Sequence, residues 1–269
     1  LNLINKNDTM KNEEWRKMID IKKAQTELIK HVEELHPNNP RAKIKLEHIM
    51  RVAKISKKIA IELKLTKEQI QLAELIGLLH DIGRFEQYKQ LKTNQEFNHG
   101  EIGVDILKKE NYIRKYCTEN IYDNIIYKAI YEHNRYQLTE GLTEEEKLFC
   151  KIIKDADKID LLYEAVFIYW QEPERIKEVE QGNLSKKMLE DFHNYKLADV
   201  RNKKGETDQI LRFASFVFDI NFPCSFEILK ESDIISKMIN KFEYQIPETK
   251  KEMKKIEKIA NKYIKEKCK

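Results

Sequence analysis

The sequence predicts an all-α protein, and three observations carry that prediction. Apolar residues recur every three to four positions along nearly the whole chain, which is the period of an amphipathic helix. The 269 residues include only 7 Gly and 5 Pro, too few for the many turns of a β-sandwich or barrel. Charged residues make up 36% of the chain and hydrophobic residues 41%, a balance typical of helices with one solvated face.

Local signals divide the chain into successive helices. In chain order, we expect helices over residues 12–35, 41–63, 67–81, 98–109, 120–134 and 143–170, and further helices near 185–193, 207–218, 225–244 and 248–267. The first of these is stopped by the Pro- and Asn-rich cluster at 36–40. On the second, the spacing of Ile44, Val52, Ile55 and Ile59 predicts one buried face.

The helix starts are marked by capping residues. Thr66 with Gln69, and Thr143 with Glu146, have the spacing of a capping box, in which two side chains satisfy exposed backbone N–H groups. Asn98 opens the helix that follows it. The polar stretch 83–97 has no such period, and we expect a loop or short turns there.

The charge distribution makes a nucleic-acid-binding protein an unfavoured interpretation. The formal net charge is +4, but residues 247–269 alone hold 9 Lys and 4 Glu and account for +5. The surplus therefore lies on one terminal helix, whose apolar stripe indicates a docked helix with a solvated back. A tail that binds polyanions is the alternative.

The apolar runs and the cysteines bear on whether the protein belongs to a membrane or a secreted class. The longest apolar run, 165–170, is far shorter than the ~20 residues that span a bilayer. No charged-then-apolar leader opens the chain, and the four cysteines form no CxxC pair. We therefore expect a cytoplasmic protein with reduced thiols and no membrane partner.

Histidines and acids recur at core-facing helical positions. His48, His80 and His133 follow apolar residues at i+3 or i+4, and Asp157 lies between Ile153 and Leu161. One inward histidine is usually a hydrogen-bonded core residue, and Asp157 alone would pair with a lysine such as Lys154 or Lys158. An ordered set, in which His80 is followed by Asp81 and later by His99, is better explained by a divalent cation, which takes imidazole and carboxylate ligands.

The motif LLHDIGRF, with His48 upstream and KDADKID downstream, resembles the HD superfamily of metal-dependent phosphohydrolases, over about residues 43–162. The resemblance implies an HD-type helical bundle with an extra N-terminal helix and a C-terminal helical extension. It implies the metal ligands His48, His80, Asp81 and Asp157, with Asp155 in reserve for Asp157. The segments HGEIGVDIL and AIYEHN are similar to those that supply further histidines in binuclear members, here His99 and His133.

The resemblance also implies roles in catalysis. Asp81 would bind the metal and orient or deprotonate a water molecule. Arg84 would contact the substrate phosphate, which a guanidinium matches with its fork of donors; an exposed arginine at a helix end is the alternative. Arg135 and Lys154 are the further substrate-binding candidates.

The expected activity is hydrolysis of a phosphoester or phosphoanhydride of a nucleotide or a related small phosphorylated metabolite. One or two divalent ions, Mn, Fe, Co, Ni, Zn or Mg, would serve as cofactor. The alternative is a helical regulatory or interaction module that binds metal or nucleotide without turnover. We expect an N-terminal helix and linker at 1–40, the HD-type core at 41–165, and a C-terminal extension at 166–269 packed on that core. A homo-oligomer is compatible with the sequence.

Overall fold

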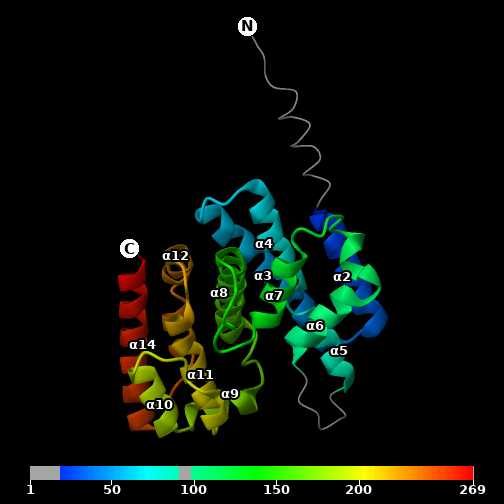
Figure 1. Cartoon of the computed structure of the whole chain (residues 1–269). Coiled ribbons are helices and arrows are strands. Elements are labelled where there is room, and N and C mark those ends of the chain that lie inside the picture. The colour runs from blue at the N-terminus through cyan, green and yellow to red at the C-terminus, as the bar shows by residue number, and fades with distance from the viewer. Residues whose placement is uncertain (1–18, 91–97, 269) are drawn as a thin grey trace. The chain divides into compact units, whose positions relative to one another are not determined.

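In the computed structural model, which describes residues 19–90 and 98–268, every regular element within these ranges is a helix (Figure 1). An isolated antiparallel bridge joins Ile19 to Cys117. The all-α prediction is confirmed. No helix among the described residues is both long enough and apolar enough to cross a membrane.

The elements follow one another with short connections. They are α2 (Ile21–Leu35), α3 (Pro40–Glu62), α4 (Lys67–Leu79), α5 (Ile82–Gln90), α6 (His99–Lys108), η1 (Lys109–Lys115), α7 (Asp123–Glu132), α8 (Glu144–Phe167), α9 (Pro173–Glu180), α10 (Lys186–His193), η2 (Val200–Asn202), α11 (Glu206–Ser215), η3 (Phe216–Asp219), α12 (Pro223–Ser232), α13 (Ile234–Ile239) and α14 (Pro247–Lys267). The chain divides into two compact units, one through Ala156 and one from Asp157, so the division falls within α8.

The first unit is built from closely paired helices. α3 and α4 lie side by side, and so do α5 and α6 (Figure 1). Two glycines permit these approaches. A Cβ on Gly77 of α4 would lie 2.6 Å from Ala53 Cα on α3, and one on Gly83 of α5 would lie 2.1 Å from the His99 carbonyl oxygen on α6. Both contacts are with backbone, so a larger residue would separate the helices.

The second unit gathers α9 to α14 around aromatic residues. α14 packs against α11, α12 and α13, and α12 and α14 lie side by side in Figure 1. Trp170 is fully buried and stacks edge-on against Phe213 and Phe242. The apolar stripe of α14, including Met253 and Ile256, is buried, which confirms a docked helix.

Capping signals placed the helix starts well. Thr66 and Gln69 form both hydrogen bonds of a capping box, and Thr143 and Glu146 do the same. Asn98 caps α6 by accepting a hydrogen bond from the Gly100 N–H. The first predicted helix, 12–35, was wrong at residues 19 and 20, which precede α2 and its cap at Asp20. Residues 12–18 of that prediction lie outside the described residues.

The predicted loop over 83–97 was wrong for residues 83–90, which belong to α5. Residues 91–97 lie outside the described residues. The helix forms because Ile82 and Phe85 are fully buried and Gly83 lets the backbone approach α6. These are tertiary contacts, which local periodicity does not reveal.

Two further predictions need correction, and one α-helix was missed. The expected helix over 225–244 is two helices, because Asp233 adopts a left-handed conformation at φ 48° and ends α12. Helix α9 was not predicted. Ile44, expected on the buried face of its helix, is 44% exposed. The buried face of α3 is narrower than the set of its apolar residues and does not include Ile44.

Candidate metal centre

Most of the predicted ligands stand at helix ends. His80 follows the last residue of α4, Asp81 lies between α4 and α5, and His99 is the first residue of α6. His133 follows the last residue of α7. The two other predicted ligands lie inside helices, His48 within α3 and Asp157 within α8. The helices thus bring His48 and the four residues at helix ends, which are far apart in sequence, to one place, and these five residues are buried.

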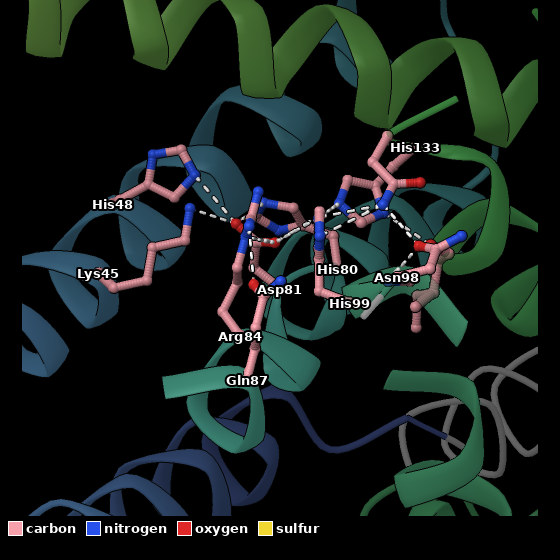
Figure 2. Close-up of polar contacts among 12 residues, drawn as sticks. Lys45, His48, His80, Asp81, Arg84, Gln87, Asn98, His99 and His133 are labelled. Atoms are coloured by element: carbon pink, nitrogen blue, oxygen red, sulfur yellow. Dashed lines mark hydrogen bonds and ion pairs between the residues drawn. The ribbon is translucent and has the colours of Figure 1, made fainter. Parts of the chain in front are cut away.

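Asp81 is the centre of this group. The Nε2 atoms of His80 and His48 lie 3.4 Å and 3.7 Å from its Oδ2 atom. Those of His99 and His133 lie 3.3 Å and 3.5 Å from its Oδ1 atom. Figure 2 shows His48 on one side of the carboxylate and His99 and His133 on the other. Each carboxylate oxygen therefore faces two imidazoles.

Backbone carbonyls orient two of these imidazoles. His80 Nδ1 lies 2.8 Å from the Gly77 carbonyl oxygen, and His133 Nδ1 lies 2.6 Å from that of Ile130. A carbonyl oxygen only accepts, so each Nδ1 carries the proton and donates it. In the neutral rings the Nε2 lone pairs then point toward the Asp81 carboxylate. Acceptors that face one another in a buried cluster repel unless a proton or a cation lies between them.

Charge and burial oppose each other at Asp81. Burial works to raise the pKa of its carboxyl, but the charge of Lys45 beside it holds that pKa well below 3.8. Burial lowers the pKa of His99 to about 3, against the raising effect of Asp81. Asp81 is therefore anionic and His99 neutral near pH 7, which are the forms that bind a metal.

The donor set fits a divalent cation. Asp81, His99 and His133 have ligand atoms within 4.8 Å of one another, and all three are buried. Imidazole nitrogens with a carboxylate suit Mn, Fe, Co, Ni or Zn, and the carboxylate suits Mg as well. The buried cluster of His and Asp residues thus has the composition and tautomers of a metal site.

The predicted substrate-binding residues are placed differently from one another. Arg84 lies with its Nε atom 3.5 Å from Asp81 Oδ1, and its guanidinium donates to Gln87 Oε1. Arg135 lies over the ring of Tyr131, 4.1 Å from its centre. Lys154 is buried and donates to the Arg135 carbonyl oxygen at 2.7 Å. Arg84 thus contacts the central carboxylate.

The loop after His133 is fixed by hydrogen bonds to two buried charged residues, Glu132 and Lys154. The Glu132 carboxylate, fully buried, accepts hydrogen bonds from the Thr139 N–H and hydroxyl. Lys154 holds the carbonyl of Arg135 in the same loop. Lys154 therefore stabilises the conformation of this loop, and its role as a substrate contact stays a prediction.

The two candidate carboxylates on α8 differ in burial. Asp155 is fully buried, and Asp157 is half-buried and begins the second compact unit. The choice between them as metal ligand stays a prediction.

Sequence reasoning missed two residues of this site. Lys45 forms an ion pair with Asp81 Oδ2. Asn134 places its amide nitrogen 3.3 Å from His99 Nδ1 and donates to Asn98 Oδ1. Lys45 lies three residues before His48, on the same face of α3, so helical spacing was a signal that could have found it. Asn134 directly follows His133, but nothing in its spacing distinguishes it.

Comparison with known families gives one match to this region. A family model described as the HD domain matches residues 46–162. This range begins two residues before His48 and includes all six predicted metal ligands. Searches of curated proteins and of solved structures gave no match.

Proposed function

From the HD domain over residues 46–162, we propose that this protein is a metal-dependent phosphohydrolase that acts on a small phosphorylated metabolite, with nucleotides as the first class to test. One observation carries the proposal: four buried imidazoles surround a single buried carboxylate, Asp81, with two imidazoles at each oxygen. A histidine-rich donor set of this kind is costly to bury unless it binds a cation.

The arrangement around Asp81 supports two adjacent ions. His48 and His80 would hold one ion at Oδ2, and His99 and His133 a second at Oδ1. Bound metal would supply an activated water molecule and would neutralise charge on a phosphoryl oxygen. The resemblance adds Asp157 as a further ligand, and the pair of variants Asp157→Ala and Asp155→Ala decides between these two acids.

Arg84 is the best-placed residue for substrate phosphate. Its side chain is 36% exposed, whereas Asp81 beside it is 4% exposed, so the guanidinium is accessible to a ligand in solution. The hydrogen bond to Gln87 orients one edge of the guanidinium. The other N–H groups of the guanidinium can donate hydrogen bonds to an anionic ligand. Holding the phosphate there would place it next to the metal ligands.

The experiment combines metal content with a substrate panel. The purified chain, loaded in turn with Mn²⁺, Mg²⁺, Co²⁺ and Zn²⁺, is assayed against nucleotides, cyclic nucleotides, dinucleotides and sugar phosphates. Asp81→Ala and His80→Ala should lose both bound metal and hydrolysis, and His193→Ala, an exposed histidine paired with Glu252, should keep both. Metal bound by the parent chain without hydrolysis across the panel would favour the regulatory module instead.

A further inference from the structure

The ion pair between Lys45 and Asp81 lies inside the proposed metal cluster. Lys45 Nζ contacts Asp81 Oδ2, the same oxygen that faces His48 and His80. The Lys45 side chain is only 16% exposed. Figure 2 shows its amino group directed at the carboxylate from the His48 side. A single ammonium therefore neutralises the oxygen that an ion on this side would bind.

We propose that Lys45 is a built-in competitor for the metal ion at Asp81 Oδ2, so that an ion enters this position by displacing the ammonium. The inference rests on the proposed metal site. Two cations beside one carboxylate oxygen repel each other, and burial keeps water from screening the repulsion. Metal affinity at Oδ2 is thus reduced by the free energy of the Lys45–Asp81 pair.

The other oxygen of Asp81 lacks an equivalent competitor among the described residues. The cation nearest to Oδ1 is Arg84, at 3.5 Å, and its guanidinium is more exposed and also bonded to Gln87. A longer and better-solvated ion pair is the weaker one. We therefore expect the two positions to fill at different metal concentrations, with the His99 and His133 side filled first.

Lys45 also has a task in the metal-free chain. Asp81 is buried and paired with Lys45, and a buried charge that loses its partner destabilises the fold. The ammonium partners the buried carboxylate and holds the cluster together until an ion replaces it. The same residue thus stabilises the metal-free protein and opposes metal binding, which is a combination that a purely structural lysine would not have.

Manganese titration by calorimetry on the EDTA-treated protein tests the inference. Lys45→Met should bind the weaker Mn²⁺ ion about tenfold more tightly, a coupling of ordinary size between two cations that share a site. Lys45→Arg keeps the charge and should behave as the parent. Lys57→Met removes a lysine of the same helix, paired with Glu74 at 2.9 Å, and serves as the matched control. Adding His80→Ala to Lys45→Met should abolish the gain.

Thermal unfolding supplies a second readout. Without metal, Lys45→Met should melt below the parent, and with saturating Mn²⁺ it should melt at or above it. Lys45→Gln removes the charge but keeps a hydrogen-bond donor, and it is measured in the same way if Lys45→Met does not fold. A variant that melts below the parent in both states, with unchanged or weaker Mn²⁺ binding, would overturn the inference. If the parent and the Lys45 variants all failed to bind Mn²⁺, the metal site itself would be wrong.

Discussion

The Nε2 atoms of His99 and His133 lie 3.1 Å apart, although 34 positions separate the two residues in sequence. The proton of His133 is on Nδ1, which donates to the Ile130 carbonyl, so its Nε2 atom is an acceptor. Two histidine nitrogens at this distance are held by a shared proton or by a cation that both bind. Asp81 Oδ1, within 3.5 Å of each, favours the cation.

The first prediction is that His99 and His133 hold the second of two ions. His99→Ala and His133→Ala should each lose one equivalent of metal and keep the other, because His48 and His80 remain at Asp81 Oδ2. Hydrolysis should fall by more than about 100-fold. Loss of a residue that only hydrogen-bonds to a metal ligand costs up to about 100-fold in activity, and loss of a ligand itself should cost more. Elemental analysis and anomalous diffraction measure the ions, with His193→Ala as the control. A parent chain that binds one ion at saturation, and two fully active variants, would leave both histidines structural.

The second prediction concerns Arg84. If its guanidinium contacts substrate phosphate, Arg84→Ala should lower kcat/KM by about 10–100-fold, equivalent to ~1.4–3 kcal/mol for a charge-assisted hydrogen bond. Metal content and thermal stability should not change, because Arg84 lies at the edge of the cluster. Arg41→Ala, an exposed arginine at the start of α3, is the control. Kinetics equal to those of the parent would show that Arg84 is an exposed residue at a helix end without a role in substrate binding.

The third prediction concerns the contact between α5 and α6. In Gly83→Ala, the new Cβ would meet the His99 carbonyl oxygen at 2.1 Å and Gly103 N at 2.7 Å, so the helices must separate. The free energy of unfolding should fall by about 1–3 kcal/mol, and the affinity for the ion at His99 should fall with it. Gly205→Ala, where a Cβ meets nothing within 4 Å, should change stability by less than about 1 kcal/mol. Urea titration followed by metal titration measures both effects; equal stabilities would show that the backbone adjusts without cost.

The fourth prediction is a pH dependence in the second unit. Burial works to raise the pKa of Glu206, but hydrogen bonds from Arg175 and Trp170 and the charge of Lys203 hold that pKa below 4.5. Because the folded pKa lies below the unfolded one, Glu206 stabilises the fold above about pH 4.5, and this contribution is lost as the pH falls through the folded pKa.

The test compares the parent with Glu206→Gln. The variant should be less stable by about 1 kcal/mol at pH 7, after allowance for screening of a partly exposed group, and the difference should shrink below about pH 4.5. Trp170 donates to Glu206 Oε2, so its fluorescence in a Trp15→Phe background reports unfolding at this position. A difference that stays constant from pH 7 to pH 3 would contradict the assignment.

Local signals carried much of what could be predicted. The caps at Thr66, Asn98 and Thr143 are recognisable because the bonds of a helix start join residues two or three positions apart. The inward positions of His48, His80 and His133 follow from helical period alone, and all three are buried. The resemblance to HD proteins rested on the same residues, and the HD domain over residues 46–162 confirms it.

The sequence by itself determined the helical class, the helix starts and the kind of residues that form the site. Only the tertiary structure decided which oxygen of Asp81 each histidine faces, that residues 82–90 form a helix against α6, and that Lys45 joins the cluster. The physical reason is the separation along the chain over which each kind of interaction acts. Capping and periodicity act within one or two turns of a helix, whereas the ligand geometry depends on how closely separate helices approach, which Gly77 and Gly83 permit through backbone contacts far apart in the chain.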